Sequence, residues 1–180
     1  VSSEWEAVNN LEIGGRNLIL DSERERFKDN TTGSAIIDIF TFPYLFSRNS
    51  EYVLSFDVKG TGQYSFVVSG YDYPIESIAS NGAIGADAGG NILFDAPDVW
   101  ERVWIKIRTK NWGEETANKP VLLRVPVGSS LYLKNLKFEK GNKATDWTPA
   151  PEDVQAAIDD AVVKATYWSI KASSPVIYKD

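Results

Sequence analysis

The residues of this 180-residue chain that could do chemistry are carboxylates, cations and exposed aromatic rings, because the chain contains no Cys and no His. Their absence excludes disulfides, thiolate or imidazole zinc sites, and the Ser-His-Asp and Cys-His nucleophilic pairs. Carboxylates alone could support a glycosidase, which needs two of them roughly 5 to 10 Å apart across a cleft. No spacing of acidic residues predicts such a pair, so the sequence favours a protein that is not an enzyme.

A set of aromatic residues with polar neighbours points instead to binding. Trp104 alternates with Val103 and Ile105, so it is expected on the outer face of a strand, together with Arg102 and Arg108. An indole there could carry the apolar face of a sugar ring while polar groups bond the hydroxyls. It could equally pack beneath a loop or be covered by a stacked arginine. The predicted carbohydrate-binding residues are Trp104, Trp112, Tyr71, Tyr73, Arg102, Arg108 and Asp72.

Other ligand classes have weaker support. Asp21, Glu23, Glu25 and Asp29 could offer oxygens to a structural Ca²⁺, but cations lie between them and the spacing of a calcium loop is missing. No metal or other cofactor is therefore predicted, and a structural Ca²⁺ stays open. The net charge is −6, and residues 16–149 are nearly neutral, so nothing suggests the basic surface that nucleic acid requires. No apolar run is long enough to suggest a membrane partner.

The elements that must position these residues are mostly short strands separated by Gly, Asn and Asp. Residues 52–58 and 64–68 alternate and predict a hairpin, with Tyr52, Phe56 and Tyr64 among its core side chains. Further strands are expected over residues 17–20, 35–40, 91–94, 100–109, 121–127 and 131–138, with a long surface loop over residues 80–91. The pattern predicts an all-β fold, a two-sheet antiparallel jelly-roll β-sandwich, followed by a C-terminal α-helix.

The C-terminal segment changes to a helical period. Prolines and acids in residues 149–153 suit a helix N-terminus, and the helix is expected to continue to about Lys171. Val154, Ile158, Ala161, Ala165 and Trp168 follow the 4, 3, 4, 3 spacing of a coiled-coil seam. The seam covers about two heptads, fewer than a coiled-coil assignment needs. The helix could therefore also lie on the sandwich or link it to another domain.

The domain organisation follows from these elements. We expect an N-terminal connector over residues 1–15, the jelly-roll domain over residues 16–149, a linker or oligomerisation helix over residues 150–172, and the start of a following element over residues 173–180. The chain begins at Val1 and contains no Met. We therefore expect it to be a piece of a longer polypeptide.

Two segments of the chain resemble a known family. Gly14-Gly-Arg-Asn17-Leu-Ile19, and the segment from Leu136 to Asp153 with its run Lys143-Ala-Thr-Asp-Trp147-Thr-Pro149, resemble the opening and closing motifs of a carbohydrate-binding-module-like jelly-roll domain. That domain occurs in tail and baseplate proteins of siphophages of Gram-positive bacteria, among them minor structural, receptor-binding and baseplate accessory proteins. The resemblance spans about residues 14 to 153. It implies that Asn17 and Glu139 tie the first and last strands together and that Trp147 caps the core, outside the sugar site.

The resemblance also implies a function. It suggests a non-catalytic saccharide-binding module of the virion, made in the host cytoplasm, that assists adhesion to cell-wall or capsular polysaccharide. The expected partners are a host cell-surface saccharide, other tail or baseplate subunits, and two further copies of the chain joined through the C-terminal helix as a homotrimer. Two alternatives stay open, namely a purely structural spacer or trimerisation module of a tail fibre, and a polysaccharide-degrading domain.

Overall fold

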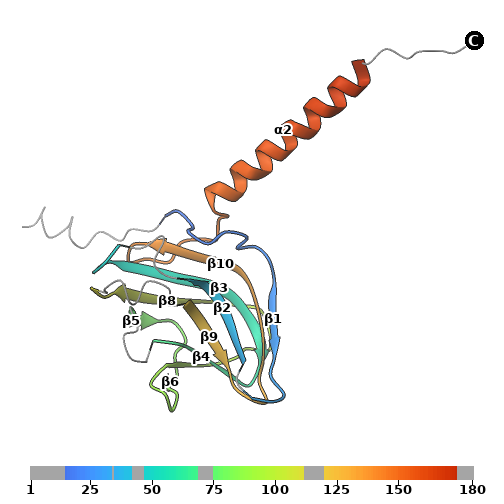
Figure 1. The fold of residues 1–180 in the computed structure, drawn as a ribbon. Helices are drawn as coiled ribbons and strands as arrows, with labels where there is room; N and C mark the ends of the chain where they lie inside the picture. Colours follow the sequence, from blue (N-terminus) through green and yellow to red (C-terminus); the bar gives the residue numbers. More distant parts are fainter. Residues whose placement is uncertain (1–14, 34, 42–46, 69–74, 112–119, 174–180) are drawn as a thin grey trace, which may run out of the picture.

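The chain folds into two antiparallel β-sheets and one projecting helix (Figure 1), seen in a computed structural model that describes residues 15–33, 35–41, 47–68, 75–111 and 120–173. Sheet A has five strands in the order β1 (Arg26–Asp29), β10 (Ser130–Lys140), β3 (Glu51–Thr61), β8 (Glu101–Thr109) and β5 (Ile75–Ser80). Sheet B has five in the order β2 (Ala35–Thr41), β9 (Pro120–Val125), β4 (Gln63–Phe66), β7 (Ile92–Asp95) and β6 (Gly85–Ala86).

The strand pairing follows one nested pattern. In sheet A, β1 pairs with β10 and β3 pairs with β8, while in sheet B, β2 pairs with β9 and β4 pairs with β7. All of these pairs are antiparallel, as expected when one long antiparallel hairpin is rolled up into two sheets. This is the jelly-roll arrangement, so the predicted all-β sandwich followed by a helix is confirmed.

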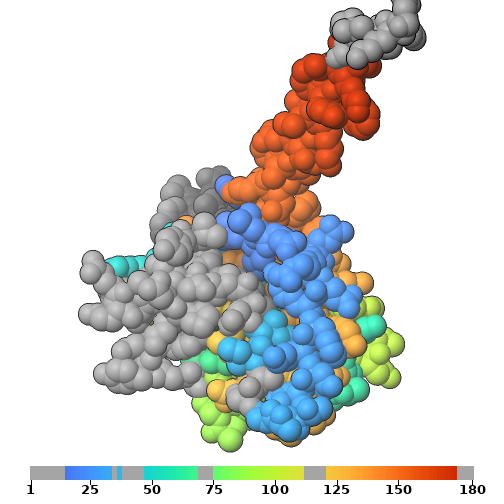
Figure 2. Space-filling view, turned by 45° about the vertical axis from the view of Figure 1, so that its right-hand side comes forward, coloured from blue at the N-terminus to red at the C-terminus, as the bar shows by residue number. Residues whose placement is uncertain are grey.

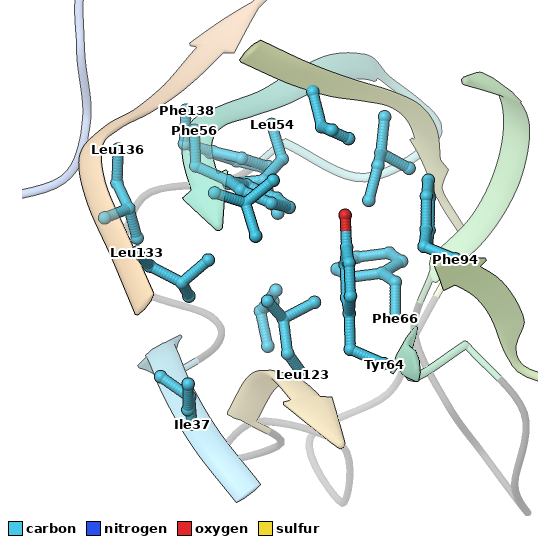
Figure 3. Packing of buried hydrophobic residues seen from close by; sticks show 14 of the residues in the cluster. Ile37, Leu54, Phe56, Tyr64, Phe66, Phe94, Leu123, Leu133, Leu136 and Phe138 are labelled. Atoms are coloured by element: carbon cyan, nitrogen blue, oxygen red, sulfur yellow. The ribbon is translucent and has the colours of Figure 1, made fainter. Parts of the chain in front are cut away.

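The core lies between the sheets and is filled by alternate side chains of their strands (Figure 3). The predicted core residues Tyr52, Phe56, Tyr64 and Phe66 are all fully buried. Tyr64 stacks on Phe94 with ring centroids 5.0 Å apart. Burial of each such side chain stabilises the fold by about 1.5 to 3 kcal/mol. Along β8, Val103, Ile105 and Ile107 also point into this core, which leaves the intervening side chains on the outer face of sheet A.

Some local predictions are wrong. Residues 52–58 and 64–68 do not form a hairpin, because β3 belongs to sheet A and β4 to sheet B. The chain crosses between the sheets at Gly62, whose φ of 78° suits glycine. Residues 17–20 do not form a strand either. The predicted loop over residues 80–91 contains the short strand β6, and β5, which precedes it, was not predicted.

The helix α2 (Pro151–Ser173) projects from one end of the sandwich (Figures 1 and 2). None of its side chains is buried, so the alternative that it lies on the sandwich is wrong. Its base is fixed by an ion pair between Arg16 and Glu152 and by the Asp153 carboxylate, which accepts the Asp21 N–H at 2.8 Å. Acidic side chains in the first turn also favour helix formation there. Among the described helical residues, no stretch is apolar enough over a sufficient length to cross a membrane.

Candidate functional site

The outer face of sheet A carries two of the residues singled out from the sequence. Arg102 and Trp104 alternate with the core side chains of β8 and therefore point outward. The strand register places Asp57 of β3 opposite Arg102 and Ser55 opposite Trp104. Two neighbouring rows of this face are therefore polar and aromatic.

A segment that follows β10, residues 141–149, lies against this face, and we call it the closing segment. Lys137 Nζ donates to Thr145 Oγ1 at 2.7 Å and to the Asp146 carbonyl at 2.8 Å. The Glu139 carboxylate accepts the Thr145 hydroxyl at 2.7 Å and the Thr145 N–H at 3.2 Å. Burial lowers the pKa of the Lys137 ammonium, although the Glu139 carboxylate opposes this shift. The two almost fully buried charged side chains thus hold the closing segment in place.

The closing segment and the strands border an open hollow of about 370 Å³. Its lining residues are Ser55, Asp57, Arg102, Trp104, Ala144, Thr145, Asp146 and Trp147. A second hollow of about 260 Å³ also includes Trp104 and is completed by Lys106, Asn142, Lys143 and Ala144. We call the first of these the Trp104 hollow. It brings two partly buried indoles, those of Trp104 and Trp147, beside polar side chains.

A hydrogen-bond network fixes the polar groups in the Trp104 hollow. The Arg102 guanidinium donates to Ser55 Oγ at 2.9 Å, to Asp57 Oδ1 at 3.3 Å and to the Asn135 carbonyl. Asn135 Nδ2 donates to Asp57 Oδ2 at 2.8 Å. Burial lowers the pKa of Arg102, and the Asp57 carboxylate opposes this shift. The network therefore presents a preoriented donor and acceptor next to the indoles.

Hydrogen bonds fix the backbone at Trp104 and the indole of Trp147. The backbone of Trp104 forms two hydrogen bonds with Asn81. The Asn81 side-chain oxygen accepts the Trp104 N–H at 2.8 Å, and the Asn81 backbone N–H donates to the Trp104 carbonyl at 3.3 Å. The indole Nε1 of Trp147 donates to Ser22 Oγ at 3.2 Å. Trp147 therefore lines the hollow while it is anchored to the segment that precedes β1. Two indole rings in one hollow suit stacking against a flat apolar surface.

The opening segment, residues 15–19, is joined to the closing segment through Asn17. The side chain of Asn17 is buried, and its Nδ2 donates to the carbonyls of Leu136 and Thr148, both at 2.8 Å. Its Oδ1 accepts the N–H groups of Ile19 at 3.0 Å and Phe138 at 3.1 Å. Gly15 N also donates to the Glu139 carboxylate at 2.8 Å. These bonds replace the strand ladder that was predicted over residues 17–20.

The structure brings only some of the predicted site residues together. Arg102 and Trp104 share the Trp104 hollow. Arg108 does not line it and is paired with Glu51 at 2.9 Å and Glu76 at 3.9 Å. The other four predicted binding residues, Tyr71, Asp72, Tyr73 and Trp112, lie outside the described residues.

Sequence reasoning missed other residues of the hollow, chiefly Asp57 and Trp147 as members of the binding surface. The alternation of Asp57 with Phe56 and Val58 already placed its side chain on the outer face of its strand. For Trp147 the sequence holds no comparable local signal, because its position depends on how the closing segment lies against sheet A.

The four acidic residues considered as Ca²⁺ ligands are not gathered into one cluster. In the part of the chain that the structure describes, no three acidic side chains gather closely enough to hold a metal ion. Asp21 instead pairs with Arg24, whose Nε lies 2.6 Å from its carboxylate.

Comparisons with known proteins give remote likenesses. No family model matches the chain, and no curated protein matches its sequence. Among solved structures, the chain is similar to the tripod from the baseplate of bacteriophage Tuc2009, with 13% identity, a TM-score of 0.48, and coverage of 78% of this chain and 61% of that one. A candidate sugar-binding protein from Bacteroides thetaiotaomicron aligns with 13% identity, a TM-score of 0.31, and coverage of 69% of this chain and 86% of that one. At these values neither likeness assigns a function.

Proposed function

We propose that the sandwich is a non-catalytic saccharide-binding module and that the Trp104 hollow is its binding site. The observation that carries this proposal is the pairing of two indoles, Trp104 and Trp147, with the fixed Arg102–Asp57 network in one open hollow. Sugar rings have apolar faces that stack on aromatic rings and hydroxyl groups that need donors and acceptors. The hollow supplies both kinds of contact side by side.

The state of the carboxylates supports binding without turnover. Both oxygens of Asp57 accept hydrogen bonds, one from Arg102 and one from Asn135, so this group serves as an oriented acceptor. Asp146, the other acid that lines the hollow, belongs to an exposed position of the closing segment. A glycosidase instead needs an acid and a base or nucleophile on opposite sides of the scissile bond. We therefore propose a binding role rather than polysaccharide degradation.

The biological setting is proposed from the opening and closing motifs. Their resemblance to the jelly-roll domain of siphophage tail and baseplate proteins supports a place in the virion, next to other tail or baseplate subunits. The ligand would then be a cell-wall or capsular polysaccharide of the host. Binding at one site is expected to be weak, with a Kd on the order of 0.1 to 1 mM, and to gain strength from many copies.

Binding of the 180-residue chain to an array of bacterial cell-wall and capsular polysaccharides tests this function. Trp104→Ala should weaken binding to every retained polysaccharide by about tenfold or more, since it removes one stacking surface. Tyr167→Ala is the control, because this aromatic ring lies on α2 outside the predicted seam and is 56% exposed. Equal binding by wild type and Trp104→Ala would show that the hollow is not the site.

A second role, trimerisation, is favoured by the exposure of α2. Seam residues Val154 and Ile158 are 43% and 51% exposed, although both are apolar. We infer that α2 packs against the same helix of two other copies. The 4, 3 spacing puts Val154 at a d position and Ile158 at an a position, and β-branched residues at both favour more than two strands.

Light scattering on the chain tests this assembly. The wild type should have about three times the chain mass of 20.0 kDa, and Ile158→Asp with Ala165→Asp should reduce it to a monomer by placing charges in the seam. Ala156→Asp with Thr166→Asp adds the same charge outside the seam and should leave the trimer intact. A monomeric wild type at high concentration would refute the assembly without affecting the saccharide site.

A further inference from the structure

A second aromatic surface lies on the outer face of sheet A. Phe27 and Tyr132 stack with their ring centroids 4.2 Å apart. Lys59 Nζ lies 5.2 Å from the ring centre of Tyr132 and 5.0 Å from that of Trp100. Lys134 Nζ lies 4.2 Å from the ring centre of Trp100. We call these five residues the aromatic–lysine strip.

The strip is built by the register of neighbouring strands. Phe27 of β1 is paired with Tyr132 of β10, which is paired with Lys59 of β3. Trp100 directly precedes β8 and continues the same row. Phe27 is 51% exposed and the other members are partly buried. Because the row crosses an outer sheet face, its rings and ammonium groups are accessible to a ligand.

Neither lysine of the strip is held in an ion pair by the part of the chain that the structure describes. Among the described residues, neither Lys59 nor Lys134 forms a salt bridge, whereas Arg102 and Arg108 on the same face are each paired with carboxylates. The lysines lie instead against ring faces, an interaction of about 0.5 to 1 kcal/mol at an exposed site. An ammonium group in such a contact keeps hydrogen-bond donors for another partner. The strip therefore presents two positive charges beside aromatic surfaces.

The strip adjoins the Trp104 hollow. Trp100, Arg102 and Trp104 occupy alternate positions along the chain and share the outer face of sheet A. Trp104 comes four positions after Trp100, which corresponds to about 13 Å along a strand. The row between them contains Lys134, Asp57 and Arg102. One extended molecule could therefore contact both surfaces.

We propose that the ligand of this face is an acidic saccharide chain that spans the hollow and the strip. One sugar ring stacks on Trp104, and a residue that bears a carboxylate or a phosphate binds Lys59 and Lys134. This inference rests on the proposed saccharide-binding function and adds the charge and extent of the ligand. The net charge of −6 does not oppose it, because most of that charge lies in residues 1–15 and 150–180 and the sandwich is nearly neutral.

The experiment uses acidic bacterial polysaccharides and their neutral derivatives on one array. Carboxyl reduction removes uronate charges and enzymatic dephosphorylation removes phosphate charges, while the sugar backbone stays the same. The full chain is compared with Lys59→Gln plus Lys134→Gln. The control, Lys110→Gln plus Lys164→Gln, has the same net charge but changes lysines at the far end of β8 and on α2.

The wild type and the control should bind at least one acidic polysaccharide about tenfold more tightly than its neutral derivative. The Lys59 and Lys134 variant should lose this preference, and the treatment that abolishes binding identifies the anionic group. Oligosaccharides of the retained polymer should compete at least tenfold better than its monosaccharides.

Equal binding of acidic and neutral forms, or an unchanged preference in the Lys59 and Lys134 variant, would overturn the inference. If either of these results were obtained and Trp104→Ala still weakened binding, the proposed saccharide-binding function would stand without the acidic ligand. If no polysaccharide were retained by the wild type, both would fail.

Discussion

Replacing Asn17 with alanine should be among the most destabilising single changes outside the apolar core. The Asn17 side chain forms hydrogen bonds with four backbone groups, namely the N–H groups of Ile19 and Phe138 and the carbonyls of Leu136 and Thr148. Alanine can replace none of these bonds. The bonds to Ile19, Phe138 and Leu136 are buried, so water would not readily take the place of the amide.

The expected magnitude follows from those unpaired groups. A buried donor or acceptor without a partner costs about 1 to 3 kcal/mol, and partial relaxation of the opening segment reduces the total. We expect the free energy of unfolding to fall by about 3 to 5 kcal/mol. For a protein of this size each kcal/mol lowers the Tm by about 2 to 4 °C, so the Tm should fall by roughly 6 to 20 °C.

Thermal unfolding followed by circular dichroism measures this change. Gln155→Ala is the control, because it removes an amide whose hydrogen bond, to Asp159, is exposed on α2. This control should change the Tm by less than about 2 °C. A similarly small change for Asn17→Ala would show that the opening segment does not depend on the Asn17 bonds.

Three further predictions concern stability. Tyr64→Phe should raise the free energy of unfolding, measured by chemical denaturation, by about 1 kcal/mol, because the buried Tyr64 hydroxyl has no hydrogen-bond partner among the described residues. A loss of stability would show that this hydroxyl does form a hydrogen bond. Gly60→Ala should lower the Tm by several degrees, since a Cβ there would overlap the Ser130 carbonyl, and an unchanged Tm would contradict that packing. Burial alone would raise the pKa of Asp87, but hydrogen bonds, first from Ser65 and then from Asn91 and Gly89, lower it from 3.8 to about 2. The Asp87 carboxylate therefore stabilises the fold above pH 3.8, and this contribution is lost as the pH falls toward 2. Between pH 5 and about 2, the Tm of the wild type should fall more than the Tm of Asp87→Asn. Equal decreases in Tm for the two proteins would refute this prediction.

The sequence predicted which side chains fill the core better than it predicted which strands pair. Alternation along residues 52–58 and 103–107 identified the inward face, because the period of two belongs to each strand alone. It could not show that β3 and β4 lie in different sheets, since pairing depends on contacts with β10 and β9, distant in the sequence. The strand β5 escaped prediction because its pattern is weak, with Ile75 buried but Ile78 exposed.

For the candidate site too, the sequence predicted the face on which a side chain lies but not which distant segments meet there. Alternation placed Arg102 and Trp104 on an outer face, where the structure has them. The contribution of Trp147 depends on the closing segment, which is held against sheet A by the buried Lys137 and Glu139. Such tertiary contacts leave no local pattern in the sequence.

The position of the opening and closing segments also determines how the domain responds to mechanical load. The opening segment and the base of α2 lie at the same end of the sandwich (Figure 1), joined by the hydrogen bonds of Asn17 to Thr148 and of Asp21 to Asp153. Tension between these two points would pull on those few bonds and would not shear the long ladders of β3, β8 and β10. The hydrogen bonds between the opening segment and the base of α2 would open first, and the sandwich would stay folded with its outer face still available to a ligand.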